Sequence, residues 1–110
     1  MTNLDLINSG MFQVINQGET EKEITGIFNC DLLSISMSKA KERSAWVTIM
    51  GNINTVAVAA LTDLSVIILA EGVNMDDNAV EKALESDITV LRTEEPIFET
   101  SLKLYQWLNA

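Results

Sequence analysis

Residues 45–61 have the sequence AWVTIMGNINTVAVAAL. The first part of this segment is apolar and rich in β-branched residues, which predicts a buried strand, and the last part predicts an apolar helix. The turn between them supplies small and polar residues, namely Gly51, Asn52, Asn54 and Thr55. Ligands of open α/β sheets usually bind where a strand ends and a helix begins, so this turn is the first candidate for a site.

Strands and helices alternate on both sides of this segment. Beyond it, strands are predicted at 11–15, 24–30, 66–69 and 88–91, and helices at 3–8, 32–42, 79–85 and 96–107. Such alternation is typical of a parallel sheet with helices on both faces. We therefore expect one domain over residues 1–110, an α/β fold with three α/β/α layers and a mostly parallel central sheet. For the small β elements near the N-terminus, antiparallel pairing at the edge of the sheet is an alternative.

Two residues close to the first strands have an expected local role. Gly26 lies inside an apolar run, which suggests a β-bulge or a close backbone contact. Asp31 comes directly before the helix predicted at 32–42, and an aspartate there is expected to cap the free amides of the first turn.

The charge balance limits the classes of partner. The chain has 16 acidic and 7 basic residues, giving a net charge of -9, and such a field repels nucleic acid and anionic membranes. The one basic cluster, Lys39, Lys41 and Arg43, is interpreted as cations that complement a helix dipole rather than as a binding patch. The single cysteine, Cys30, allows no internal disulfide, and neither a signal peptide nor a membrane span is recognisable. We expect a cytoplasmic protein.

Parallel strands place their carboxyl ends at one edge of a sheet, so four junctions are expected to meet there. That edge would carry amides, hydroxyls, carboxylates and one arginine, with Arg92 able to fork onto an anionic group. The candidate ligand-binding residues are Asp31, Ser34, Gly51, Asn52, Asn54, Thr55, Glu71, Gly72, Arg92 and Thr93.

The usual catalytic motifs are missing from the sequence. There is no histidine, which removes the commonest general base and metal ligand, and no phosphate-cradling G-x-x-x-x-G-K-[ST] loop. We expect no metal and no cofactor, and we predict that the chain is not an enzyme. The enzymatic alternative would depend on carboxylates such as Asp31, Glu71 and Glu94, or on Asp31 with Ser34.

Several short motifs appear together in order along the chain. They are Ile24-Thr25-Gly26, Asp31-Leu32-Leu33-Ser34, Met37, Ala40-Lys41, Trp46-Val47-Thr48-Ile49, Asn54-Thr55-Val56-Ala57-Val58-Ala59, Val66-Ile67-Ile68-Leu69-Ala70-Glu71-Gly72, Ile88-Thr89-Val90-Leu91 and Phe98-Glu99-Thr100. In this order and spacing they resemble the DRTGG domain family, from about Leu4 to Leu108. The chain is also similar to the non-catalytic N-terminal domain of HPr kinase/phosphorylase.

The chain departs from the family at the residues that give it its name. Asn52-Ile53 stands where a typical member has Asp-Arg, and Ala70-Glu71-Gly72 stands where it has Thr-Gly-Gly. A stand-alone subgroup with the Asp-Leu-Leu-Ser signature often carries the label "serine kinase". The missing nucleotide-binding loop argues against that activity.

The resemblance implies a regulatory or dimerising α/β module, since such domains accompany CBS modules in regulated pyrophosphatases. Our leading hypothesis is a homodimeric sensor that binds a small anionic ligand, such as a nucleotide, or a partner protein. The alternative is a pure adaptor subunit of a redox or metabolic complex, with Ile97, Leu104, Trp107 and Leu108 of the last helix as candidate contacts. No nucleic-acid or membrane partner is expected.

Overall fold

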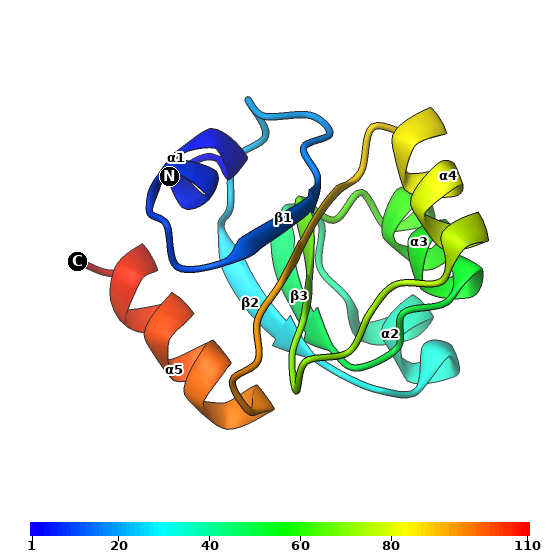
Figure 1. The fold of residues 1–110 in the computed structure, drawn as a ribbon. Coiled ribbons are helices and arrows are strands. Elements are labelled where there is room, and N and C mark those ends of the chain that lie inside the picture. Colours follow the sequence, from blue (N-terminus) through cyan, green and yellow to red (C-terminus); the bar gives the residue numbers. More distant parts are fainter.

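The computed structural model describes residues 1–110 and contains five helices and five strands (Figure 1). In chain order they are α1 (Asn3–Asn8), β1 (Gln13–Asn16), β2 (Gly26–Asn29), α2 (Leu33–Lys39), β3 (Ser44–Thr48), α3 (Ile53–Leu61), β4 (Val66–Leu69), α4 (Asp77–Glu85), β5 (Thr89–Arg92) and α5 (Ile97–Leu108). No helix combines the length and the apolar composition that crossing a membrane requires.

The strands form one sheet in the order β1-β5-β4-β3-β2. Strands β2 to β5 are parallel, and β1 pairs antiparallel with β5 at one edge. The predicted three-layer α/β fold with a mostly parallel sheet is therefore confirmed. The antiparallel option holds for β1 alone, because β2 is parallel to β3.

The two edge strands differ in regularity. The register of β1 shifts between Val14 and Asn16, whereas β2 pairs without interruption from Gly26 opposite Ser44 onward. A Cβ atom added at Gly26 would lie 3.8 Å from the Ser44 hydroxyl oxygen, an ordinary contact. The bulge or close backbone contact predicted at Gly26 is therefore wrong.

The apolar run of β4 fills both faces of the sheet. Ile67 and Leu69 belong to the core cluster under α2, α3 and α4, and Val66 and Ile68 belong to the cluster under α1 and α5 (Figure 1). All four side chains are buried. Burial of each of these side chains stabilises the fold by about 1.5–3 kcal/mol. Because helices cover both faces of a parallel sheet, a central strand such as β4 carries apolar residues on both faces.

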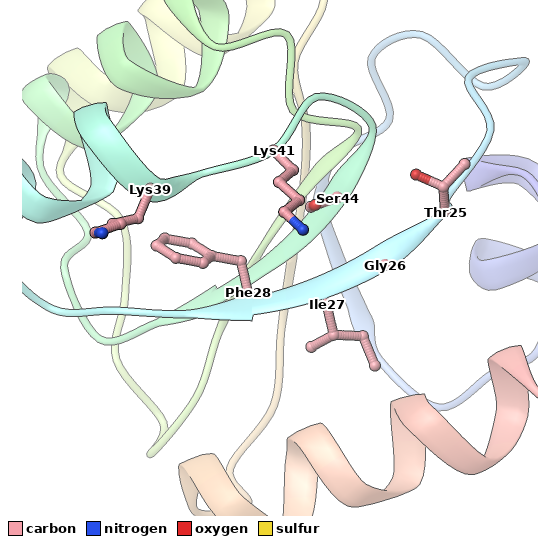
Figure 2. A pocket seen from close by; sticks show the side chains of 7 residues that line it. All are labelled: Thr25, Gly26, Ile27, Phe28, Lys39, Lys41 and Ser44. Atoms are coloured by element: carbon pink, nitrogen blue, oxygen red, sulfur yellow. The ribbon is translucent and has the colours of Figure 1, made fainter.

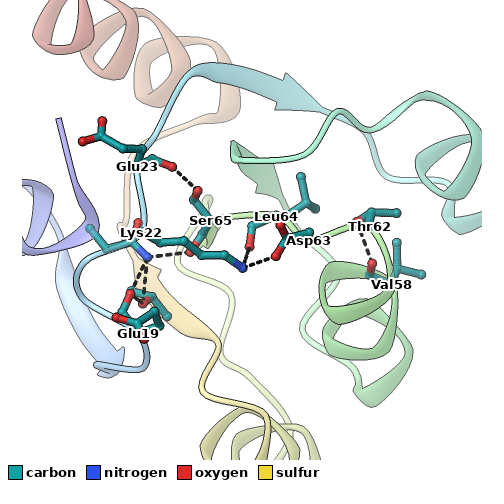
Figure 3. Close-up of polar contacts among 10 residues, drawn as sticks. Glu19, Lys22, Glu23, Val58, Thr62, Asp63, Leu64 and Ser65 are labelled. Carbon is teal, nitrogen blue, oxygen red and sulfur yellow. Dashed lines mark hydrogen bonds and ion pairs between the residues drawn. The ribbon is translucent and has the colours of Figure 1, made fainter.

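A polar cluster fixes the connector before β2 to the amino end of β4 (Figure 3). Lys22 Nζ lies 2.6 Å from Asp63 Oδ1 and donates a 3.1 Å hydrogen bond to the carbonyl of Leu64. The Ser65 hydroxyl donates to the carbonyl of Glu23. Lys22 therefore has a structural role.

Candidate functional site

The carboxyl ends of the parallel strands meet at one edge, as expected. Asp31, after β2, accepts hydrogen bonds from the Thr48 hydroxyl (2.8 Å) and the Ile49 amide (3.1 Å) after β3. The Thr93 amide, after β5, donates to the carbonyl of Leu69 in β4 (2.8 Å). The predicted junctions are neighbours in the structure.

Asp31 does not cap α2. The N-cap residue is Leu32, whose position has no side-chain hydrogen bond, and the helix ends at Lys39 instead of continuing to residue 42. The Asp31 carboxylate turns away from the helix because the end of β3 offers it a hydroxyl and an amide donor. The predicted N-cap role of Asp31 is wrong, and its structural role is to join two loops.

The turn after β3 is closely packed. A Cβ atom at Gly51 would collide with the carbonyl oxygen of Asn74 and would lie 3.1 Å from Met75 Cα. Asn52 is the N-cap of α3, where its side chain accepts from the Thr55 amide at 3.1 Å. Thr55 itself is buried. These residues have identifiable packing and capping roles.

Arg92 holds the turn after β4. Its guanidinium donates to the carbonyls of Gly72 (2.6 Å) and Val73 (3.3 Å) and to Gln13 Oε1 (2.9 Å). Gly72 and the preceding Glu71 have φ values of 71° and 59°, the left-handed region that a tight turn uses. The Arg92 side chain is only 14% exposed and also contacts Glu94. The guanidinium group therefore donates hydrogen bonds to backbone carbonyls of its own chain.

Two of the candidate side chains have no partner within the chain. Ser34 and Asn54 are exposed and form no side-chain hydrogen bond. Glu71 accepts from the Ile97 amide at 3.3 Å, and the Thr93 hydroxyl accepts from a backbone amide at 3.2 Å. At the carboxyl edge, therefore, most predicted binding groups are engaged internally.

A hollow of about 300 Å³ lies elsewhere, between β2 and the segment that joins α2 to β3 (Figure 2). Its lining residues are Thr25, Gly26, Ile27, Phe28, Lys39, Lys41 and Ser44. The Lys41 side chain reaches toward β2 from the opposite wall, whereas the Lys39 side chain points away from Lys41, past the Phe28 ring (Figure 2). The Ile27 side chain points to the other face of the sheet, toward α5 (Figure 2).

The cations at this hollow are free of ion pairs. Among the basic side chains, Lys22, Arg92 and Lys103 pair with carboxylates. Lys39 and Lys41 pair with none, in a chain whose net charge is -9. Since acidic residues outnumber basic ones so strongly, two unpaired lysines on one small concavity form a local positive site.

The floor of the hollow offers two further kinds of contact. The Ser44 hydroxyl is used by no hydrogen bond within the chain, although the residue is only 5% exposed. The Phe28 ring is half-buried and tilted against Trp46, with ring centroids 6.4 Å apart. Cations, a hydroxyl and an aromatic ring together suit an anion attached to a planar or apolar group.

The sequence-based site did not include any residue that lines the hollow. The cluster of Lys39, Lys41 and Arg43 was the available signal, and it was assigned to the dipole of α2. Lys39 does lie in the last turn of α2, as that assignment expects. What the sequence could not show is that the same lysine, with Lys41, lines a hollow beside β2.

Comparison with known proteins finds a similar fold in a solved structure. No protein-family model matches the chain, and no curated protein sequence matches it. Among solved structures, it is similar to the CBS and DRTGG domains of the regulatory region of Clostridium perfringens pyrophosphatase, complexed with an activator, diadenosine tetraphosphate. The TM-score is 0.64 at 14% identity, and the match covers 93% of this chain and 44% of that one. The chain thus spans less than half of that neighbour, and at 14% identity the likeness shows the fold alone.

Proposed function

We propose that this chain is a non-catalytic regulatory module that binds a small anionic ligand in the hollow beside β2. The observation that carries the proposal is the pair Lys39 and Lys41, which line a concavity and have no ion-pair partner in a strongly acidic chain. An unpaired cation pair in a concave site attracts anions locally even when the whole molecule is negative.

The lining favours a phosphorylated ligand with a planar or apolar part. Lysine is a common point-charge binder of phosphate, the Ser44 hydroxyl can donate to a phosphate oxygen, and Phe28 offers an apolar surface. A volume of about 300 Å³ is at the small end of ligand pockets. Because the similar regulatory region was solved with a dinucleotide activator, nucleotides and dinucleotides are the first ligands to test.

The test is a thermal-shift screen of the whole chain with nucleotides, dinucleotides, phosphorylated metabolites and divalent metals. A ligand present at a hundred times its Kd stabilises by about 2.7 kcal/mol, which raises Tm by roughly 10 °C for a domain of this size. We expect Lys41→Ala to reduce the shift strongly. Lys82→Ala is the matched control, since Lys82 on α4 is another lysine without an ion pair and lies outside the hollow.

The outcomes separate the two candidate locations. Asn54→Ala removes one of the two free side chains at the carboxyl edge, so a shift lost in Asn54→Ala and kept in Lys41→Ala would place binding at that edge and contradict the hollow. The absence of a shift with every phosphorylated compound would contradict the small-anion function itself.

Self-association belongs to the same proposal. A regulatory module of this kind would act as a homodimer, and light scattering coupled to gel filtration measures this directly. A mass close to the 12.1 kDa of one chain at high micromolar concentration would contradict the dimer.

A second candidate function, a protein adaptor, is favoured by an exposed stripe on α5. The contacts suggested from the sequence lie on the inner face: Leu104 is buried, and Ile97, Trp107 and Leu108 pack on the core cluster under α5. The outer face instead exposes Phe98, Leu102 and Tyr105, spaced as i, i+4 and i+7. A partner protein that binds the unsubstituted chain and does not bind the Phe98→Glu variant would support the adaptor function.

A further inference from the structure

The open edge of β2 is the second feature of this region. A strand in the middle of a sheet pairs on both sides, but β2 pairs with β3 alone. The Thr25 amide donates to the Arg43 carbonyl next to β3. Because successive amides of a strand point to opposite sides, the amides of Gly26 and Phe28 point outward, away from β3.

The opposite edge of the sheet lacks this regular template. In β1 the register shifts between Val14 and Asn16, which interrupts the ladder that an added strand would extend. In β2 the register is continuous over all four residues and contains neither a bulge nor a proline. Of the two edges, β2 is the one that presents an unbroken row of backbone groups.

From this geometry we infer that the β2 edge is a docking surface for an acidic, extended segment of a partner protein, which adds a strand beside β2. The backbone groups of Gly26 and Phe28 would supply the main-chain hydrogen bonds. Lys39 and Lys41 lie beside this strand without an ion pair, so they would attract carboxylates on the added strand.

The same charges select against a second copy of the chain. Two copies paired through β2 around a twofold axis would bring their Lys39 and Lys41 side chains toward one another, and like charges at a sheet edge oppose such pairing. An acidic partner turns the same repulsion into attraction. The charge of the β2 edge therefore favours binding of an acidic strand over pairing with a second copy of the chain.

The test uses the intact chain labelled with ¹⁵N and a soluble peptide of alternating valine and glutamate, with a valine–lysine peptide as the charge control. At a peptide concentration about ten times its Kd, exchange of the Gly26 and Phe28 amides should slow by about tenfold. The inward-facing Ile27 amide is the internal reference. Lys41→Ala should weaken binding by about two- to fivefold, and Lys82→Ala should not.

Gly26→Pro and Ser44→Ala together separate this inference from the small-ligand proposal. A proline at an outward-facing edge position removes no hydrogen bond to β3, yet it removes one docking donor and obstructs an added strand. We expect Gly26→Pro to lose the peptide. Ser44→Ala, which removes only the hydroxyl that can donate to a phosphate, should reduce the thermal shift produced by a small anion and keep the peptide. Circular dichroism checks that the Gly26→Pro variant is folded. If it is not, exchange of the Phe28 amide in the unsubstituted chain, with and without the valine–glutamate peptide, tests the edge.

Two results would overturn the inference. One is unchanged exchange of the Phe28 amide at saturating valine–glutamate peptide, or equal protection by the valine–lysine peptide. The other is protection of the Phe28 amide in a dimer without any peptide, which would assign the edge to a second copy. Neither result bears on whether a small anion binds in the hollow.

Discussion

The carboxyl edge of the sheet and the hollow beside β2 both gather polar side chains, but the two regions use them differently. At the carboxyl edge Arg92, Asp31 and Asn52 are directed at backbone groups of their own chain. In the hollow, Lys39, Lys41 and the Ser44 hydroxyl have no such partner. The contrast shows that polar residues at a favourable place in a fold indicate a binding site only when the fold leaves them unpaired.

Two glycines give the largest expected difference between the regions. Gly51→Ala places a Cβ against the Asn74 carbonyl, and backbone must shift to accommodate it, so we expect a loss of about 2 kcal/mol or more in the free energy of unfolding. Gly26→Ala meets only an ordinary contact and should cost far less. Urea denaturation of both variants measures the difference, and equal losses would contradict the close packing at Gly51.

Substitution of Arg92 is expected to have the next largest effect on stability. Arg92→Ala leaves the carbonyls of Gly72 and Val73 without their charged donor, which should cost about 2 kcal/mol in stability. Arg92→Lys should recover only part of this, because a single ammonium cannot reproduce the planar fork. A fully stable Arg92→Ala variant would show that the guanidinium is free for a ligand, as the sequence suggested.

Asp31 should have a smaller effect of the same kind. Asp31→Ala removes the acceptor for the Thr48 hydroxyl and the Ile49 amide, with an expected loss of about 1 kcal/mol. Asp31→Asn keeps an acceptor oxygen and should restore most of it. Thermal unfolding distinguishes the two variants, and a loss that asparagine does not reduce would point to the charge instead of to the acceptor.

The lysines of the hollow should affect stability least. Lys39→Ala and Lys41→Ala break no ion pair, so each should change the free energy of unfolding by less than about 0.5 kcal/mol. The same substitutions should reduce anion binding, and raising the salt concentration should weaken that binding in the unsubstituted chain. A marked loss of stability without any loss of binding would reverse the contrast between the two regions.

The regular part of the fold could be predicted from local pattern. The run Val66–Leu69 is β4 without adjustment of its ends. Pro96, predicted as the first helical residue, is the N-cap of α5, so the helix begins one residue later, at Ile97. These predictions succeed because periodicity and breakers act over a few residues. The helix predicted at 32–42 is shorter in the structure, where α2 spans Leu33–Lys39 and Leu32, not Asp31, is the N-cap residue.

The roles of the candidate site residues depended on contacts that are distant in sequence. Asp31 is bound 17 residues away at Thr48, and the reason for Gly51 is the backbone of Asn74. Arg92 was correctly placed at the carboxyl edge. Its pairing with Gln13 across the antiparallel edge had no counterpart in any local pattern.

The sequence by itself determined the class of fold, the order of the strands and helices along the chain, and the meeting of strand ends at one edge. Each of these follows from apolar periodicity and from the geometry of parallel sheets. The tertiary structure alone decided which polar groups are satisfied and which are free. Lys22 and Lys41 are the same residue type in the same acidic chain, yet packing gives Lys22 a carboxylate at 2.6 Å and leaves Lys41 facing an open strand edge.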